Sequence, residues 1–127
     1  MPVRVLLVDD QAMFVAAVHA LLADDDRIEI VGDATNGVQA IELADALQPD
    51  VALVDLDLPL LDGYETTKRL LAQNPTLRVV VISGMSENGV AERAADAGAA
   101  GYLFKGGLYG EIADAIVSSS QPFQASA

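Results

Sequence analysis

Short apolar runs alternate along this chain with longer segments in which apolar residues recur every three or four positions. The runs have strand length and are rich in valine and isoleucine, which is typical of strands buried on both faces. The longer segments have the spacing of amphipathic helices. We predict strands at Val3–Val8, Ile28–Val31, Val51–Val54, Arg78–Ile82 and Gly101–Phe104, and helices at about Ala12–Ala23, Gly37–Leu47, Tyr64–Ala72, Asn88–Ala97 and Leu108–Val117.

Turn-forming and capping residues separate these segments. Gly32-Asp33 ends the second predicted strand, and Asn36 has a side chain suited to cap the helix that follows. Pro49-Asp50 ends that helix, because the residue before a proline avoids the helical conformation. Gly98 suits the C-terminal end of the fourth helix, where a left-handed residue is favoured.

The predicted helices carry apolar residues that we expect to face the core. These are Val15, Val18, Leu21 and Leu22 in the first helix, Val38, Ile41 and Leu47 in the second, and Leu108, Ile112, Ala115 and Ile116 in the last. Alternating strands and helices predict right-handed crossovers and a parallel sheet with helices on both faces. The fold class is therefore α/β in one domain, followed by a tail, Ser118–Ala127, of linker composition.

Composition narrows the range of functions. The 127 residues include 19 acidic and 7 basic side chains, which give a formal net charge of −12. Because nucleic acid binding depends on cations that neutralise phosphates, we expect no direct DNA binding by this chain. The absence of cysteine excludes disulfides, zinc–thiolate sites and redox thiols. We recognise neither a membrane-spanning stretch nor a signal peptide, and we expect a cytoplasmic protein.

Chemically active side chains follow four of the predicted strands. Asp9-Asp10 comes after the first strand, Asp55 after the third, Ser83 after the fourth and Lys105 after the fifth. The carboxyl ends of parallel strands meet at one edge of a sheet, so we expect these side chains to converge. Neighbouring carboxylates repel each other, and Mg²⁺, which prefers oxygen ligands, relieves that repulsion. An aspartate, a cation and a hydroxyl together suit phosphoryl transfer onto the aspartate.

The motifs at these strand ends resemble those of the receiver domain of two-component response regulators. They are Asp9-Asp10, Asp55–Gly63, Ser83-Gly84 and Gly101–Lys105. The resemblance covers about residues 3–118. Two further stretches, Ile28–Gly32 and Gly98–Leu103, are most similar to the NarL/LuxR-type subfamily, whose full-length members carry a helix-turn-helix output domain. The resemblance implies a flavodoxin-like, doubly wound sheet of five parallel strands in the order 2-1-3-4-5 with five helices.

The resemblance also implies the metal site. Asp10 would bind Mg²⁺ (or Mn²⁺) directly, and Asp9 would bind it directly or through water. Asp55 and the backbone carbonyl of Asp57 would complete the protein ligands. No other cofactor is expected.

The same resemblance assigns roles in phosphorylation. Asp55 would be the phosphoacceptor, and Lys105 would pair with the phosphoryl group or, before phosphorylation, with Asp55. Ser83 would move toward the new phosphate, and Tyr102 would swing inward as a switch. Residues 1–118 would then form the receiver domain, with 119–127 a tail or the start of a linker to an output domain.

The implied function is a phosphorylation-activated signalling switch. Its partners would be a sensor histidine kinase, an output domain that controls transcription and, on phosphorylation, a second copy of the chain. It would catalyse only its own phosphorylation and dephosphorylation, and so would not be an enzyme with an external product. The alternative is a stand-alone or phosphorylation-independent receiver that acts as a protein-interaction module. A phosphatase of the haloacid dehalogenase type and an FMN-binding protein are weaker alternatives.

The sequence departs from the common receiver pattern in two places. Many receivers have a proline after the lysine, whereas Gly106-Gly107 follows Lys105 here and favours a more flexible loop. Asp57 and Met85, each two residues past a site residue, are at positions that influence the lifetime of the phosphate in the family. The single histidine, His19, we expect on an exposed side of the first helix, with no role as a ligand.

Overall fold

The computed structural model describes residues 1–84, 89–106 and 110–119. Strands and helices alternate throughout, as the hydrophobic pattern predicts. The strands are β1 (Val3–Val8), β2 (Ile28–Ala34), β3 (Val51–Asp55), β4 (Arg78–Ser83) and β5 (Gly101–Phe104). The helices are α1 (Ala12–Leu22), α2 (Gly37–Leu47), α3 (Gly63–Gln73), α4 (Val90–Asp96) and α5 (Gly110–Ser119).

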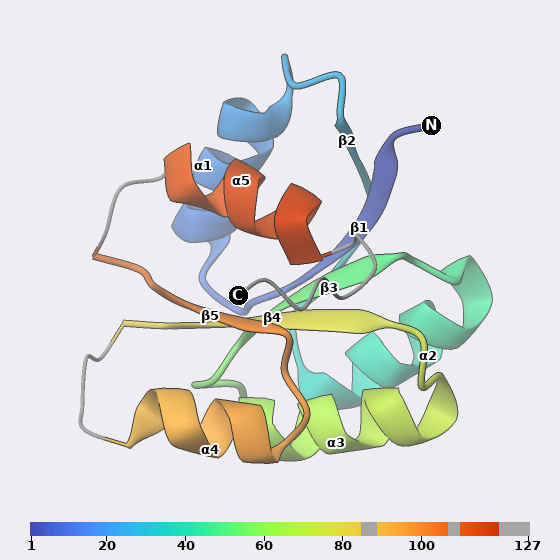
Figure 1. Cartoon of the computed structure of the whole chain (residues 1–127), viewed down its shortest axis with the longest axis vertical. Coiled ribbons are helices and arrows are strands. Elements are labelled where there is room, and N and C mark those ends of the chain that lie inside the picture. The colour runs from blue at the N-terminus through green and yellow to red at the C-terminus, as the bar shows by residue number, and fades with distance from the viewer. Residues whose placement is uncertain (85–88, 107–109, 120–127) are drawn as a thin grey trace, which may run out of the picture.

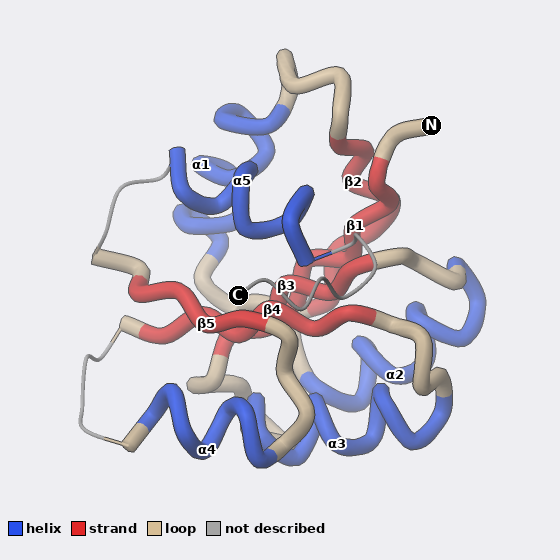
Figure 2. The backbone as a smooth tube through the Cα atoms, in the orientation of Figure 1, coloured by secondary structure: helices blue, strands red, loops and turns tan. Residues whose placement is uncertain are grey.

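The five strands form one parallel sheet in the order β2-β1-β3-β4-β5, which confirms the predicted fold. Figure 2 shows the strands as a central layer with helices on either side. The chain moves outward from β1 to β2, then crosses back to β3 on the other side of β1. Ligands of such open sheets bind at this switch point, beyond the carboxyl ends of the strands.

Each central strand is apolar on both faces because helices cover both sides of the sheet. Alternate residues of β1 show this division: Val5 and Leu7 join the core under α1 and α5, whereas Leu6 and Val8 join the core under α2, α3 and α4. Figure 1 shows these two helical layers. The long runs of valine in the sequence are therefore explained by burial on both faces.

Helix α1 packs mostly as its apolar spacing predicts. Val18 and Leu22 are buried, and Val15 packs against the same core from a half-buried position. The prediction was wrong for Leu21, whose side chain is 38% exposed. Leu21 and Leu22 are adjacent, so the 100° turn between them allows only one to point at the sheet.

Helix α2 contacts the core through smaller side chains than the sequence predicts. Ile41 and Leu47 pack against the core as expected, but Val38 is 43% exposed. The fully packed positions are Ala40 and Ala44 instead. Small alanine side chains at the contact allow the helix backbone to lie close to the sheet.

The last two helices confirm only the parts of the prediction that fall on described residues. Ile112 and Ile116 of α5 are buried, and Ala115 is half-buried. Asn88 and Leu108, where we predicted that the fourth and fifth helices begin, lie outside the described residues.

Strand β2 is longer than predicted. Gly32-Asp33, expected to end the strand, continues it to Ala34. After a shift in register between Val5 and Leu6, the last three residues of β2 pair with the end of β1. A turn-forming residue is tolerated here because β2 is an edge strand and the side chain of Asp33 is exposed.

Specific caps fix the ends of several helices. The Asn36 side chain accepts a hydrogen bond from the Gln39 backbone N–H at 2.8 Å, as predicted for an N-cap. Asp62 caps α3 in the same way, with Glu65 as its donor at 2.8 Å. Gly98 follows α4 with a φ of +102°, the left-handed conformation expected of it. Among the described residues, no helix has both the length and the apolar character needed to cross a bilayer.

A close backbone contact at Gly63 holds the start of α3 against the end of β3. The Gly63 N–H donates a hydrogen bond to the Leu56 carbonyl at 3.0 Å. A Cβ atom at Gly63 would lie 2.5 Å from both the Asp55 carbonyl oxygen and the Leu56 Cα atom. Both neighbours are backbone atoms, so the contact cannot be relieved by rotating a side chain.

We therefore expect Gly63→Ala to lower the free energy of unfolding by about 1–3 kcal/mol, the usual cost of overpacking. Urea denaturation measures this change. Gly110→Ala is the matched control, because a Cβ atom there meets no atom of the described residues within 4 Å. Equal stability of the two variants would contradict the close contact at Gly63.

Candidate functional site

The pairing of the strands brings the predicted site residues to one edge of the sheet. Val8 pairs with Val54, so Asp9 and Asp55 come next to each other beyond that pair. Ser83 is the last residue of β4 and pairs with Phe104, the last residue of β5. Lys105 therefore comes directly after the end of β5. The sheet is therefore the frame that holds residues distant in sequence at one place.

Three carboxylates form the acidic part of the site. Asp9, Asp10 and Asp55 each offer an oxygen, and these oxygens lie within 4.8 Å of one another. Asp9 and Asp55 are only 4% and 2% exposed, whereas Asp10 faces solvent. Two buried carboxylates and an exposed one at this spacing form a set of oxygen ligands suited to a hard divalent cation.

Lys105 supplies the positive charge that the two buried carboxylates need. Its Nζ atom lies 2.8 Å from Asp9 Oδ2 and 3.3 Å from Asp55 Oδ2, and its side chain is only 12% exposed. The Lys105 backbone N–H also donates to the Ser83 carbonyl at 2.7 Å. The lysine thus reaches into the site from a backbone position fixed by β4.

Two residues of the α1 region contact Lys105 that the sequence reasoning did not identify. The Gln11 side-chain Oε1 accepts a hydrogen bond from Lys105 Nζ at 2.5 Å. The Phe14 ring lies under the same ammonium, 4.5 Å from Nζ to the ring centroid. The only feature of the sequence that could have identified these two residues is their place just after Asp9-Asp10, at the start of a helix that packs against the sheet.

The hydrogen bonding of Asp9 tests whether the site fits a cation. Asp9 Oδ1 accepts a hydrogen bond from the Gln11 backbone N–H at 2.8 Å. Oδ2 is buried and receives no hydrogen bond from the described groups, although the Lys105 ammonium is close to it. A buried carboxylate oxygen with an unused acceptor position is the feature that a metal ion would satisfy.

The surroundings of Asp55 disfavour the ionised form of its carboxyl group. Burial raises the pKa of its carboxyl group, and the charge of Asp9 raises this pKa further. The hydrogen bond from the Asp57 backbone N–H, at 3.2 Å, and the charge of Lys105 act in the opposite direction. Burial and the neighbouring carboxylate outweigh these two, so the ionised form is disfavoured relative to an aspartate in water.

The loop after β3 brings its backbone near Asp55. Asp57 is exposed, and its N–H, rather than its carboxylate, contacts Asp55. Leu60 adopts a left-handed φ of 71° with a side chain that is 76% exposed, so it marks a sharp turn of the loop. Asp62 and Gly63, predicted only as turn residues, anchor this loop to α3.

Ser83 and Gly84 form the side of the site at β4. Ser83 is 3% exposed, and a Cβ atom at Gly84 would meet no atom within 4 Å among the described residues. A hollow of about 240 Å³ lies beside them, and Asp57 and Arg93 are among the residues that line it. Met85 lies outside the described residues. The site therefore has room for a small anionic group next to the Ser83 hydroxyl.

Tyr102 lies on β5, three residues before Lys105. It is half-buried and packs with Tyr64 against the core under α4. Burial raises the pKa of the Tyr102 hydroxyl, and Tyr64 raises it further. The Arg93 guanidinium stacks on the Tyr64 ring, 4.1 Å from its centroid. The predicted switch tyrosine thus has an aromatic neighbour on α3, and that neighbour in turn stacks with a cation of α4.

His19 lies outside the site, as expected. It is exposed on α1, and its Nε2 atom lies 2.9 Å from Asp33 Oδ1 on β2. This contact between α1 and the edge strand is structural and brings no residue toward Asp55.

Comparison with known proteins agrees with the geometry. The model of the response regulator receiver domain family matches residues 5–117. Response regulator GacA of Pseudomonas viridiflava is 38% identical over 114 residues, which are 90% of this chain and 53% of that protein. Transcriptional regulatory protein LiaR of Bacillus subtilis (strain 168) is 35% identical over 119 residues, which are 94% of this chain and 56% of that protein. The chain spans about half the length of these curated relatives.

Solved structures show the same fold. The signal receiver domain of NarL from Mycobacterium tuberculosis superposes with a TM-score of 0.88 at 34% identity, over 94% of this chain and 96% of that chain. A LuxR-family two-component response regulator from Aurantimonas sp. SI85-9A1 gives a TM-score of 0.89 at 26% identity, over 94% and 86% of the two chains. These likenesses agree with the subfamily predicted from the sequence. The chain belongs to the response regulator receiver domain family, and its fold is that of receivers of the NarL/LuxR type.

Proposed function

We propose that this chain is a signalling switch that accepts a phosphoryl group on Asp55 from a sensor histidine kinase. The observation that carries the proposal is the surroundings of Asp55. Its buried carboxylate lies with those of Asp9 and Asp10 and within 3.3 Å of the Lys105 ammonium. A structural ion pair does not need a third carboxylate in the same place. Phosphoryl transfer needs cations that balance the negative phosphoryl group, and three carboxylates together can hold a divalent cation for that purpose.

The proposed reaction uses Asp55 as the nucleophile. One of its carboxylate oxygens attacks the phosphorus atom of a phosphohistidine. The bond between phosphorus and the imidazole nitrogen breaks, and the imidazole leaves with the bonding electron pair. The product is an acyl phosphate on Asp55. The same attack on acetyl phosphate releases acetate, so a small phosphodonor can replace the kinase in an experiment.

Asp9, Asp10 and Asp55, with the backbone carbonyl of Asp57, are the groups we propose to hold Mg²⁺ or Mn²⁺. When bound, the ion supplies positive charge that neutralises the carboxylates and the phosphoryl oxygens. The unused acceptor position on Asp9 Oδ2 supports this assignment. The exposed position of Asp10 leaves the outer side of the cluster open to water and to the phosphodonor.

We assign the remaining positive charge to Lys105 and a hydrogen bond to Ser83. Lys105 pairs with Asp55 before the reaction and with a phosphoryl oxygen after it. The Ser83 hydroxyl donates to another phosphoryl oxygen, and Tyr102 turns inward as Ser83 moves. In this way a local change of charge is passed to the surface formed by β5 and α4.

The share of the relatives that the chain covers, and its charge, support a proposal for what the switch controls. Because the chain spans about half of its curated relatives, we propose that residues 1–118 are the receiver domain and that 119–127 begin a linker to a DNA-binding domain. The net charge of −12 makes the receiver itself a poor binder of DNA. Control of that domain, with or without pairing of two receivers, is the proposed regulatory step.

We expect wild-type protein incubated with Mg²⁺ and acetyl phosphate to gain one phosphoryl group, and Asp55→Asn to gain none. An amide is a poor nucleophile, so the loss is expected to be complete within detection. Phosphate-affinity gel electrophoresis and intact-mass spectrometry measure the adduct. Asp45→Asn, an exposed position on α2, is the control and should react like wild type. Equal labelling of Asp55→Asn and wild type would rule out Asp55 as the acceptor.

We expect Mg²⁺ to stabilise the unphosphorylated protein. At a concentration ten times the dissociation constant, binding to the folded state alone contributes about 1.4 kcal/mol. Thermal melts with and without Mg²⁺, at matched ionic strength, measure the shift. Asp10→Asn should reduce the shift without unfolding the chain, because Asp10 is exposed. Identical melting curves for wild type with and without Mg²⁺ would refute the metal site.

We expect Asp55→Asn to stabilise the metal-free protein at pH 7. The raised pKa of Asp55 means that the folded state binds its proton more tightly than the unfolded state, whose pKa is near the ordinary value of 3.8. As the pH rises from about 3.8 through the raised pKa, ionisation of Asp55 lowers the free energy of unfolding. The full decrease is present at pH 7.

Urea denaturation in EDTA, for wild type and Asp55→Asn, measures this effect at pH 7 and near pH 4. The stability advantage of the variant should be largest at pH 7 and should shrink at the lower pH. A constant difference between the two proteins over this range would show that the charge of Asp55 is not the cause.

A further inference from the structure

Lys105 is followed in the sequence by two glycines, where many receivers have a proline. Gly106-Gly107 comes next in the sequence, and glycine allows a wide range of backbone conformations. The lysine side chain itself has four rotatable bonds. Its backbone is fixed by the hydrogen bond to Ser83, but the position of the ammonium depends on what surrounds it.

The charged neighbours of Lys105 are not constant during the proposed reaction. Asp9 and Asp55 hold the ammonium by charge in the unphosphorylated protein. Neutralisation of these carboxylates by a divalent cation, or phosphorylation of Asp55, changes that attraction. An uncharged contact that attracts a cation would keep Lys105 in place through both changes.

The Phe14 ring provides such a contact. The ammonium lies 4.5 Å from the ring centroid, inside the distance of about 6 Å at which cation–π attraction operates. The Lys105 side chain is 12% exposed, and this attraction is stronger when the cation is shielded from water. The ring is therefore a fixed, neutral surface that favours one position of the ammonium.

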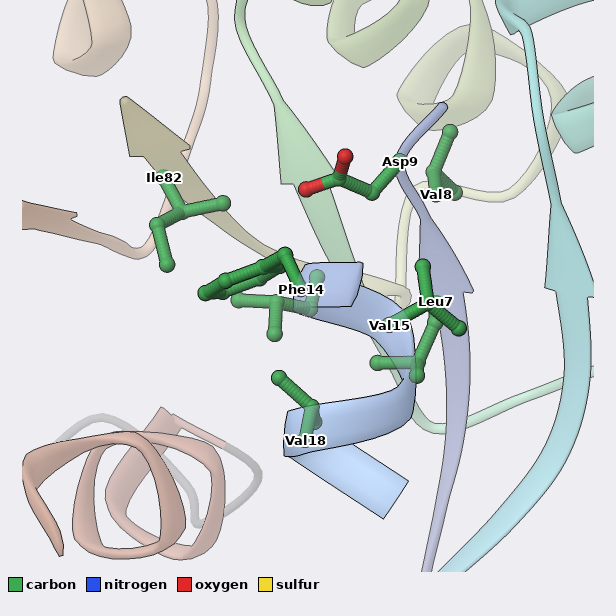
Figure 3. Close-up of a pocket in the computed structure, with 8 residues that line it drawn as sticks. Leu7, Val8, Asp9, Phe14, Val15, Val18 and Ile82 are labelled. Carbon is green, nitrogen blue, oxygen red and sulfur yellow. The ribbon is translucent and has the colours of Figure 1, made fainter. Parts of the chain in front are cut away.

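The ring is itself held in position by the core. Phe14 is half-buried and packs against the apolar cluster between α1, α5 and the sheet. Figure 3 shows its side chain extending from α1 toward Ile82, with the Asp9 carboxylate just beyond the end of β1. The ring is thus anchored in the core, whereas Lys105 is followed in the sequence by two glycines.

We propose that Phe14 is a positioning residue for Lys105, which it holds at the phosphorylation site by a cation–π contact. The inference rests on the proposed function for the reaction it serves, but the contact itself exists in the unphosphorylated chain. A leucine at this position would fill most of the same space in the core and would lack the ring that attracts the ammonium.

We expect Phe14→Leu to slow phosphorylation by acetyl phosphate with saturating Mg²⁺ by about threefold to thirtyfold, the range that runs from a partly exposed to a shielded cation–π contact. Phe14→Tyr keeps the ring and should restore the rate to within about twofold of wild type. Met13→Leu is the matched control, since Met13 is the adjacent residue of α1 and is 88% exposed. Thermal melts verify that each variant is folded.

The lysine side chains provide a second readout that packing alone would not change. The chain contains two lysines, Lys105 and Lys68, and Lys68 is exposed on α3. In protein with isotope-labelled lysine, the ring current of Phe14 should shift the Lys105 side-chain resonances away from those of Lys68. The shift should persist in Phe14→Tyr and be lost in Phe14→Leu, without any phosphodonor present.

The outcomes separate this inference from the proposed function. If wild type is phosphorylated on Asp55 and Phe14→Leu reacts equally fast, or if the Lys105 resonances do not change in Phe14→Leu, the positioning role is overturned while the proposed function stands. If wild type takes no phosphoryl group, the proposed function fails, and the lysine resonances alone decide whether the ring holds Lys105. A slow Phe14→Leu, rescued by tyrosine and accompanied by the lost shift, supports the inference.

Discussion

Repulsion between the buried carboxylates of Asp9 and Asp55 is the constraint that shapes this molecule. The pairing of β1 with β3 forces the two groups together at the sheet edge, where little water can screen them. Within the described part of the chain, Lys105 is the cation that offsets this repulsion, and it follows β5, the outermost strand on one side of the sheet. The order of the strands is therefore inseparable from the electrostatics of the site.

The hydrophobic pattern was sufficient to predict the fold class, because strands buried on both faces have long apolar runs, whereas the strand order was implied by the resemblance to receiver domains. The prediction was wrong at positions where the hydrophobic pattern is less distinct. Leu21 and Val38 are apolar but exposed, because neighbouring residues already filled the contact. Strand β2 passes through Gly32-Asp33 because pairing with β1 outweighs the local preference for a turn.

The sequence predicted which strand-end residues converge, but not all of the contacts between them and their neighbours. Strand ends can be read from a sequence, so the convergence of Asp9, Asp55 and Lys105 was expected. The contacts of Gln11 and Phe14 with Lys105 were not, because they depend on how α1 is rotated against the sheet. No periodicity in the sequence encodes that rotation in enough detail to place an ammonium over a ring.

The two halves of the site differ in how firmly they are packed. Strands β1, β3 and β4, which carry the carboxylates and Ser83, are almost entirely buried, whereas β5 is half-buried or exposed throughout. The helix before β5, α4, has only 7 residues within the described chain. Elements with less buried apolar surface rearrange at lower free-energy cost. The phosphorylation proposed for Asp55 would therefore act on a tightly packed set of strands on one side and on a less tightly packed pair of elements on the other, which is the asymmetry that a switch requires.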